Sequence, residues 1–378
     1  MPRLLMKAFI LALLLFAAVP AVAGEGRTPV YSGPMVIFTS GKYVLTQNML
    51  LMACGPPSIL IMASDVDLDL NGFTVPACPG DTSIEVQEVD NVVIRNGTVK
   101  GGKYGIHFIG SAAPGNHKVV IEDVKAVDLT DNGFLLQRYT DFALRRNNAY
   151  GNAKEGILID GGGMTVAGTI EGNQVEKCGG GITVRGGASV GIINNRLRDL
   201  TIIAAPPAQG GIVYDYSSAG LIENNTVQAI TGGSGIYLGD SSGNKIHDNV
   251  VLGAAGHGIC LAGNSDDNLV FENVSSMNGN DGLRVEGSGS HIDRNTLDRN
   301  CQNGTTSCWG LHFALLVALP GADNTFGRNT ARFNLGAAAS CPAAPLPAKP
   351  PTKDFCDEQP AAPLGNSSFN DNYMPTLF

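Results

Sequence analysis

The sequence predicts an all-β solenoid, a single-stranded parallel β-helix of about 12 coils with capped ends. The main observation is an internal repeat of 23 to 30 residues, in which each unit begins Gly-apolar-x-apolar. This alternation is typical of a short strand with one buried face. Because one such strand cannot bury its face alone, we expect the strands to stack in parallel and in register around one core. The repeats begin at Gly105, Gly133, Gly156, Gly181, Gly211, Gly235, Gly258, Gly282 and Gly310.

Asparagines recur in step with these glycines, and most follow a second alternating strand, as in the segments 221–225 and 245–249. Stacked asparagine side chains can hydrogen-bond along the axis and satisfy buried turn amides, while glycine permits a left-handed backbone at the other corners. The segments between the strands have no helical pattern, which argues against a leucine-rich repeat. The asparagines are Asn173, Asn195, Asn225, Asn249, Asn273, Asn295 and Asn329.

The composition also favours a repetitive fold over disorder. Glycine accounts for 49 of 378 residues and only 16% are charged, yet Ile, Val and Leu recur at regular intervals. The net charge of −9 argues against nucleic acid or an anionic membrane as the main partner. A polyanionic glycan stays compatible with the sequence, because a local basic patch can outweigh the net charge.

The first 23 residues are predicted to be a secretory signal peptide. Arg3 and Lys7 flank a short apolar run, and Ala21-Val22-Ala23 provides a cleavage site. The run is too short for a membrane-spanning helix, so we expect a secreted or periplasmic protein with no membrane span after cleavage; an uncleaved anchor is the alternative. The predicted divisions are a signal peptide at 1–23, an N-terminal cap with the first strands at 24–62, the β-helix at 63–336, and an Ala/Pro-rich disulfide loop with a C-terminal cap at 337–378.

All eight cysteines follow the predicted signal peptide, and export permits disulfides. Cys178 and Cys260 are more than three coils apart and should remain single thiols. The others are expected in pairs, one between stacked coils and two across short loops. These pairs are Cys54–Cys78, Cys301–Cys308 and Cys341–Cys356.

No cofactor or metal site is predicted, because the sequence has no Cys-x-x-Cys and its histidines are scattered. Two groups of carboxylates are weak candidates for calcium, although their spacing matches no EF-hand loop. They are Asp266 with Asp267, and Asp65 with Asp67 and Asp69.

The segments Leu-Asp-Leu-Asn-Gly at 68–72 and Ile-Arg-Asn-Gly-Thr at 94–98, together with the Gly-Ile and Asn-x-Val alternation, resemble the pectate-lyase-like superfamily. The resemblance covers residues 60 to 336 and is closest to bacterial secreted β-helix proteins of mostly undefined activity. It implies a right-handed parallel β-helix. The characterised members of this superfamily are largely polysaccharide lyases, hydrolases and epimerases, so the resemblance also implies an extracellular polysaccharide as partner. Such an analogy specifies the fold better than the chemistry.

The candidate catalytic residues lie on outward-facing columns of the predicted solenoid. His257 and Asp281 occupy one column on adjacent coils and are expected to pair. A lyase or epimerase needs a cation beside the uronate carboxylate and a base for the neighbouring carbon-bound proton. Arg284 is suited to the first role, and Tyr237 or His257 to the second, with Asp281 orienting the histidine. The alternative is a solvated face whose polar residues pair casually.

Further outward residues are candidates for substrate binding. Asp160, Arg185 and Asp215 occupy one column on successive coils, where a ladder of alternating charge that supports strand pairing is the alternative. Trp309 is expected to stack on a sugar ring. The full set is Glu155, Asp160, Arg185, Asp215, Glu286, Trp309 and His312.

A polygalacturonase-type hydrolase is disfavoured. The segments 256–259 and 283–285 look like the Gly-His-Gly and Arg-Ile-Lys segments of those enzymes, but the aspartates expected on the two preceding coils are missing. The favoured function is therefore an acidic-glycan lyase or epimerase. A non-catalytic glycan-binding or structural β-helix is the alternative, and a metal-handling β-helix is a weaker third hypothesis.

Overall fold

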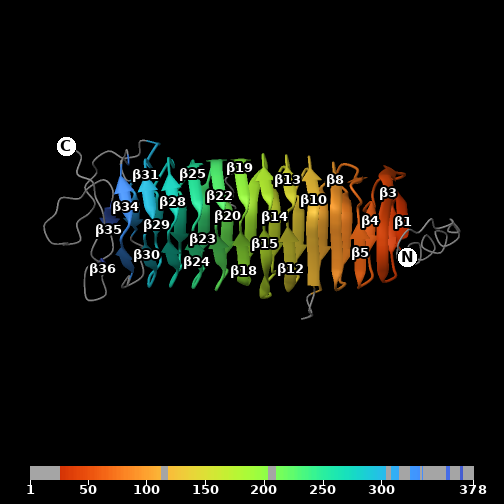
Figure 1. The fold of residues 1–378 in the computed structure, drawn as a ribbon, viewed down its shortest axis with the longest axis horizontal. Coiled ribbons are helices and arrows are strands. Elements are labelled where there is room, and N and C mark those ends of the chain that lie inside the picture. The colour runs from red at the N-terminus through yellow and green to blue at the C-terminus, as the bar shows by residue number, and fades with distance from the viewer. Residues whose placement is uncertain are drawn as a thin grey trace, which may run out of the picture.

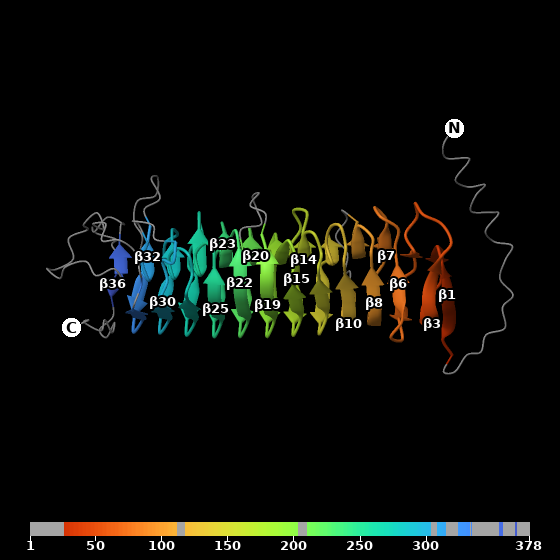
Figure 2. The ribbon, with the colours of Figure 1, turned by 90° about the horizontal axis from the view of Figure 1, so that it is seen from above.

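Two long parallel sheets wind around one axis in the computed structural model, and they give the molecule the shape of a rod (Figure 1; Figure 2). The structure describes residues 26–111, 118–202, 210–303, 308–314, 324–332, 334, 355–357 and 367–368. The predicted signal peptide, Cys341 and most of 337–378 lie outside these residues. Within them, no helix has the length and apolar character needed to cross a bilayer.

In the part of the chain that the structure describes, the first sheet has 13 strands, one from each successive coil. Its members are β2 (Met35–Ile37), β4 (Ile59–Ile61), β7 (Thr82–Gln87), β9 (Tyr104–Ile109), β11 (Phe134–Gln137), β14 (Glu155–Asp160), β17 (Gly180–Arg185), β20 (Gly210–Asp215), β23 (Ser234–Gly239), β26 (Ile259–Ala262), β29 (Leu283–Val285), β32 (Leu311–Phe313) and β35 (Phe355–Asp357).

The second sheet has 23 strands among the described residues and forms the remaining walls of the solenoid. Its members are β1 (Thr28–Gly33), β3 (Gly41–Leu51), β5 (Val66–Asp69), β6 (Thr74–Pro76), β8 (Val92–Lys100), β10 (Lys118–Val127), β12 (Asp141–Arg145), β13 (Asn148–Tyr150), β15 (Val166–Glu171), β16 (Gln174–Glu176), β18 (Gly187–Ile193), β19 (Arg196–Thr201), β21 (Leu221–Glu223), β22 (Thr226–Thr231), β24 (Lys245–His247), β25 (Val250–Ala254), β27 (Leu269–Phe271), β28 (Val274–Ser276), β30 (His291–Asp293), β31 (Thr296–Asp298), β33 (Thr325–Gly327), β34 (Thr330–Arg332) and β36 (Ser367–Ser368).

The predicted in-register stacking is confirmed by the strand pairing. The apolar residue after each repeat glycine faces the axis and lies beside its counterpart in the next coil. Ile182, Ile212, Ile236 and Ile259 form such a row, and all four are fully buried. Burying a side chain of this size contributes about 1.5–3 kcal/mol, so the stacked rows are the main source of stability.

The predicted asparagine ladder is also present, and it begins one rung earlier, at Asn147. Each rung donates its backbone N–H to Oδ1 of the asparagine in the next coil at 2.8–3.0 Å. Its side-chain Nδ2 donates to the same oxygen at 2.9–3.0 Å. Because every rung is buried, the ladder satisfies turn amides that water cannot reach.

Glycines such as Gly151, Gly186 and Gly232 have positive φ, as expected for left-handed corners, but the repeat glycines serve a different purpose. Their φ angles are not positive; the left-handed corner is filled by the residue before each ladder asparagine, for example Asn224 and Asp248. The repeat glycines are needed because neighbouring coils approach too closely for a side chain. A Cβ on Gly181 would lie 1.9 Å from the carbonyl oxygen of Gly211, and one on Gly258 would lie 1.8 Å from Oγ of Ser275.

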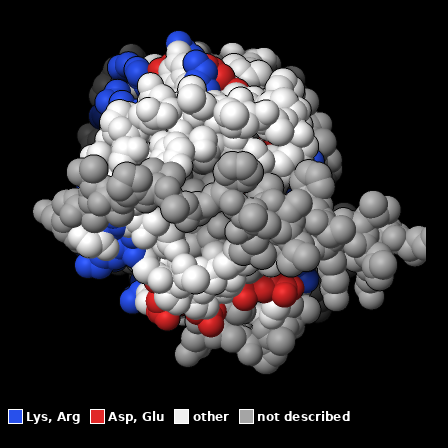
Figure 3. Space-filling view, turned by 90° about the vertical axis from the view of Figure 1, so that its right-hand side faces the viewer, with Lys and Arg blue, Asp and Glu red and all other residues white. Residues whose placement is uncertain are grey.

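Strands of the solenoid are present at both ends of the rod. β1 and β2 pair with β3 and β4 within the segment 24–62, which was predicted to hold a cap and the first strands. At the other end, β35 pairs with β32 and β36 pairs with β33. Figure 3 shows the N-terminal end, where the visible charged side chains lie near the rim. The first coil also exposes several large apolar side chains, namely Tyr31, Phe38, Leu50, Leu51 and Met52.

Two of the predicted disulfides are present, Cys54–Cys78 and Cys301–Cys308. Cys178 and Cys260 are buried free thiols, as predicted. The third predicted pair cannot be placed, since Cys341 lies outside the described residues and only the backbone of Cys356 is described.

The outer surface of the first sheet is less exposed than the alternation predicted. Leu135, Leu158 and Val213 point away from the apolar core and do not belong to it, yet all three are buried. A strip of this surface is therefore covered, and partly exposed polar side chains are spread along the sheet, from Glu85 on β7 to Arg284 on β29.

Candidate functional site

The candidate site lies where β26, β29 and β32 run side by side on the outer surface of the first sheet. His257, Asp281 and Trp309 each precede one of these strands, at equivalent places in three successive coils. The register then places Arg284 between Cys260 and His312. The regular spacing of the coils is thus what brings together residues up to 55 positions apart in the sequence.

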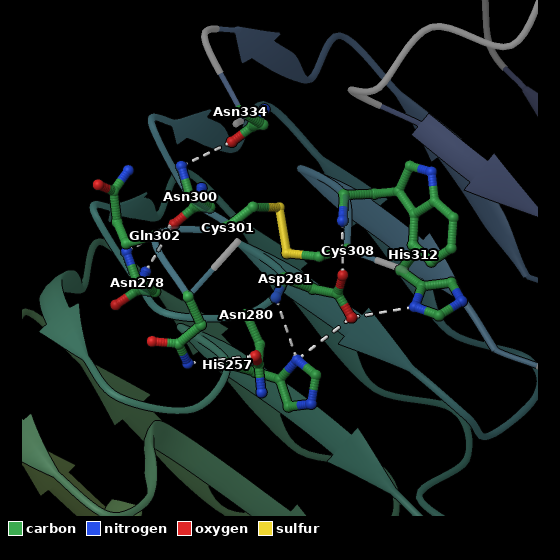
Figure 4. The surroundings of a disulfide bond; sticks show 12 residues. His257, Asn278, Asn280, Asp281, Asn300, Cys301, Gln302, Cys308, His312 and Asn334 are labelled. Atoms are coloured by element: carbon green, nitrogen blue, oxygen red, sulfur yellow. Dashed lines mark hydrogen bonds and ion pairs between the residues drawn. A yellow bond between two sulfur atoms is a disulfide. The ribbon is translucent and has the colours of Figure 1, made fainter. Parts of the chain in front are cut away.

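The carboxylate of Asp281 is the centre of this site (Figure 4). Its side chain is 1% exposed. Oδ2 lies 2.9 Å from Nδ1 of His312 and 3.2 Å from Nδ1 of His257, and Oδ1 accepts the backbone N–H of Trp309 at 2.7 Å. Nη1 of Arg284 is 3.8 Å from Oδ2. One buried carboxylate therefore contacts two imidazoles, one backbone amide and one guanidinium.

These contacts determine the ionisation of Asp281. Burial raises the pKa of this carboxyl, but the hydrogen bonds and charges of His257 and His312 outweigh burial and hold its pKa well below the usual range. Asp281 is therefore ionised at neutral pH. An ionised carboxylate can orient an imidazole through Nδ1 and stabilise the imidazolium that forms when the ring takes up a proton.

His257 is the more accessible of the two histidines, with 20% of its side chain exposed. Its Nδ1 lies 3.2 Å from both Oδ2 and the backbone N of Asp281. With a proton on Nδ1 the ring donates to Oδ2; without that proton Nδ1 accepts the backbone N–H. Both tautomers are supported by Asp281, and the first leaves Nε2 free to accept a proton.

His312 and Trp309 do not occupy the open positions that the sequence predicted for substrate binding. His312 is buried, and its contact with Oδ2 of Asp281 fixes its ring. The indole of Trp309 is only 5% exposed and packs against His312, with ring centroids 4.4 Å apart. The prediction that Trp309 offers an open face to a sugar is wrong, because the indole is buried against His312 of the same coil.

Arg284 and Glu286 form an ion pair on the surface beside Asp281. Nε of Arg284 donates to Oε1 of Glu286 at 2.8 Å, and Oε2 of Glu286 accepts the N–H of Gly263 at 3.0 Å. Burial lowers the pKa of the guanidinium, but Glu286 raises it more, so Arg284 stays charged. Glu286, predicted as a substrate ligand, thus holds the arginine in place and leaves its outer nitrogens to other acceptors.

Tyr237 and Cys260 continue the site toward the N-terminus. Tyr237 lies beside Cys260 in the register, and Cys260 lies beside Arg284. Burial and the nearby negative charges raise the pKa of Tyr237 to about 12. Burial likewise raises the pKa of the Cys260 thiol far above its ordinary value. Both groups therefore remain protonated at neutral pH, which suits Tyr237 to donating a proton and leaves Cys260 unreactive.

The second predicted set lies nearer the N-terminus on the same sheet. Asp160, Arg185 and Asp215 are aligned in the register of β14, β17 and β20. Among the described residues, however, Arg185 makes no ion pair, and its Nε is buried without a hydrogen bond. Burial raises the pKa of Asp215, while Arg185 lowers it less strongly. Glu155 is buried, so it does not form an open part of this set.

Carboxylates considered for calcium are engaged by protein groups. Asp67 and Asp69 bind Arg95, and Asp266 accepts from Ser288. One other group of described residues brings potential metal ligands within 4.8 Å of one another on the second sheet. It consists of Glu223, His247 and Asp248.

Two features of the site were not predicted from the sequence. The first is the backbone N–H of Trp309. No residue type in the sequence marks this contact with Asp281, because it depends on how the coils stack. The pairing of Arg284 with Glu286 does have a signal, since residues two apart on a strand face the same side. Asp240, which raises the pKa of both Tyr237 and Asp215, adds a further charge beside the site.

Comparisons with known proteins identify the fold as a right-handed β-helix. The family described as "Right handed beta helix region" matches residues 64–197 and 166–301, more than half of the chain. No curated protein sequence is significantly similar. The A-module of the mannuronan C-5 epimerase AlgE4 of Azotobacter vinelandii is 15% identical, with a TM-score of 0.58 and 91% of each chain covered. The periplasmic alginate epimerase AlgG is 14% identical, with a TM-score of 0.54 and coverage of 90% of this chain and 80% of that one. At these identities the similarity shows the fold alone.

Proposed function

Because this chain belongs to the right-handed β-helix family, we propose that it acts on an acidic polysaccharide outside the cytoplasm. The proposed reaction begins with removal of the carbon-bound proton next to a uronate carboxylate. Support comes from the site on the outer surface of the first sheet, and from two proteins of the same fold, an epimerase of mannuronan and an epimerase of alginate.

The observation that carries this proposal is the set of contacts around Asp281. A buried, ionised carboxylate supports Nδ1 of the partly exposed His257, which leaves Nε2 available as a general base. Arg284 lies in the same group, and its partly exposed guanidinium is the proposed partner of the substrate carboxylate, where a cation stabilises the charge that develops on proton removal. Tyr237, held protonated by its raised pKa, is the proposed proton donor.

Two outcomes follow from the same carbanion. If a proton returns to the opposite face of the carbon, the sugar is epimerised. If the carbanion instead expels the glycosidic oxygen, the chain is cleaved and an unsaturated uronate remains. We propose epimerisation or lysis as one reaction class, since both begin with His257 and Arg284.

The test is incubation of the purified protein with polymannuronate, polygalacturonate or glycosaminoglycans in heavy water. Epimerase activity places deuterium at the carbon next to the carboxylate, detected by NMR, whereas lyase activity raises the ultraviolet absorbance of unsaturated uronates. His257→Ala should reduce the rate by at least ~10²-fold. His291→Ala is the matched control, because His291 lies in the second sheet and should leave the rate unchanged. Absence of both signals with every polymer would remove the catalytic proposal.

A non-catalytic glycan-binding module is the second candidate, and one observation favours it. Arg284 is already paired with Glu286, so the site offers less free positive charge than a polyanion-binding enzyme needs. This candidate predicts retention on an immobilised glycan without deuterium exchange or cleavage. It also predicts that His257→Ala leaves the retention unchanged.

A further inference from the structure

We propose that the Cys301–Cys308 disulfide is a positioning element of the site, so that the contacts around Asp281 are complete only in the oxidised chain. The catalytic consequence rests on the proposed function, but the structural consequence does not. The two cysteines act on His257 and His312 through Trp309 and Asp281.

The disulfide joins the two segments that meet at Asp281 (Figure 4). On one side, the backbone N–H of Cys301 donates to the carbonyl oxygen of Asn280 at 3.0 Å, and Asn280 directly precedes Asp281. On the other side, Cys308 directly precedes Trp309, whose N–H donates to Oδ1 of Asp281 at 2.7 Å. The covalent link therefore closes a ring of contacts in which the carboxylate is one member.

Both cysteines are buried, Cys301 completely, so the disulfide is packed inside the corner of the coil rather than exposed at its tip. The strands on either side, β31 and β32, have only three residues each. Short strands supply few hydrogen bonds to hold the connection between them. The disulfide joins residues 7 apart in the sequence and so closes a small covalent loop.

Reduction should loosen this corner. A dithiol reductant transfers two electrons and two protons to the disulfide, giving two cysteine thiols and the cyclic disulfide of the reductant. The two sulfur atoms then separate to van der Waals distance, and the segment carrying Trp309 gains freedom. Loss of the Trp309 N–H from Oδ1 leaves a buried carboxylate with fewer donors, and that carboxylate orients both His257 and His312.

The other disulfide provides a matched control within the same chain. Cys54–Cys78 lies at the N-terminal end of the rod, joins residues 24 apart, and contacts none of the residues around Asp281. Its removal should lower stability without altering the site. The two effects of a disulfide, on unfolding and on positioning, can thus be separated.

The experiment compares Cys301→Ser/Cys308→Ser with Cys54→Ser/Cys78→Ser, each checked for folding by circular dichroism. The first readout is the NMR titration of the imidazoles of His257 and His312, which needs no enzymatic activity. We expect their titration midpoints to move in the first variant and to match the wild type in the second. Unchanged midpoints in a folded Cys301→Ser/Cys308→Ser protein would overturn the proposal.

The second readout is catalytic and tests the consequence. If a polymer is turned over, kcat should fall on the order of 10²-fold in Cys301→Ser/Cys308→Ser, with a smaller change in KM, as expected for misplaced catalytic groups. Failure of the proposed function gives no turnover in any variant, while the histidine titrations still decide the positioning proposal. An unchanged kcat with shifted titrations would contradict the catalytic part alone.

A reversible version of the test is available should Cys301→Ser/Cys308→Ser not fold. Cys54, Cys78, Cys341 and Cys356 are replaced by serine, and the remaining disulfide is reduced with a dithiol and then reoxidised. We expect the histidine titrations to shift on reduction and to return on reoxidation. Identical titrations in the two states would refute the inference.

Discussion

Nδ1 of His312 lies 2.9 Å from Oδ2 of Asp281, the same oxygen atom that lies 3.2 Å from Nδ1 of His257. The buried histidine and the accessible histidine therefore depend on one carboxylate. Any change at Asp281 affects the accessible ring and the packing between coils together.

Asp281→Asn should destabilise the fold strongly. The asparagine amide has one oxygen and one NH2 group in place of two carboxylate oxygens. If its oxygen accepts the N–H of Trp309, the NH2 group takes the place of Oδ2 and cannot accept a hydrogen bond from either imidazole. Breaking a buried charged pair typically costs about 3–5 kcal/mol of the free energy of unfolding. Chemical denaturation measures this difference. The control is Asp248→Asn, a side chain 51% exposed that contacts His247, which should change the free energy by no more than about 1 kcal/mol.

The contribution of Asp281 should also depend on pH. Its folded-state pKa is lowered relative to the unfolded chain, so the stabilisation is fully present above the unfolded value of about 3.9 and is lost as the pH falls through the folded-state pKa. Near neutral pH the ionisation of Asp281 does not change, so it should not alter the difference in unfolding free energy between wild type and Asp281→Asn. Below about pH 4 this difference should shrink. Denaturation at a series of pH values checks this, and a difference that grows in acid would contradict it.

Tyr237→Phe should lower the rate of proton exchange by roughly 10²–10⁴-fold, as expected for loss of a general acid. Because the pKa of Tyr237 is raised to about 12, the hydroxyl stays protonated across the neutral range. The wild-type rate should therefore not rise continuously toward pH 12. Such a rise would identify Tyr237 as the base instead. Tyr216→Phe is the control, since Tyr216 is exposed at the corner after β20 and should leave the rate unchanged.

Asn249→Ala should destabilise the rod at one rung of the ladder. The substitution removes the acceptor for the backbone N–H and Nδ2 of Asn225, and both donors lie in a buried environment. Each unsatisfied group costs about 1–3 kcal/mol, so thermal and chemical unfolding should both shift clearly. Asn264→Ala provides the control, because Asn264 is exposed and should alter the free energy of unfolding by less than about 0.5 kcal/mol.

The sequence was most informative where a backbone requirement recurs in every coil. Gly181 and Gly258 mark places where neighbouring coils of the chain approach closely, and Asn249 marks a turn whose amides need a buried partner. Their spacing therefore predicted the stacking and the register. The expected left-handed glycines are present at other positions, such as Gly151 and Gly186, but spacing alone did not show that the repeat glycines are needed for space.

The site was less predictable, because it depends on packing between coils of different sequence. The alternation correctly placed His257 and Asp281 on neighbouring coils, and the structure brings them within 3.2 Å. It could not show that Trp309 turns its indole against His312 and presents its amide to Asp281. Those contacts follow from side-chain volumes at one corner of one coil, which no repeat pattern records.

The asparagine ladder has a consequence for the surface of the rod. Successive rungs are separated by as few as 22 residues, between Asn173 and Asn195, and by as many as 34, between Asn295 and Asn329. The N–H to Oδ1 distances at these two steps, 2.8 and 2.9 Å, are nevertheless nearly the same. Each rung thus requires only an amide at one place in the next coil, whatever the length of chain between them. Loops elsewhere in a coil can be lengthened, shortened or exchanged while the scaffold that carries them keeps its dimensions.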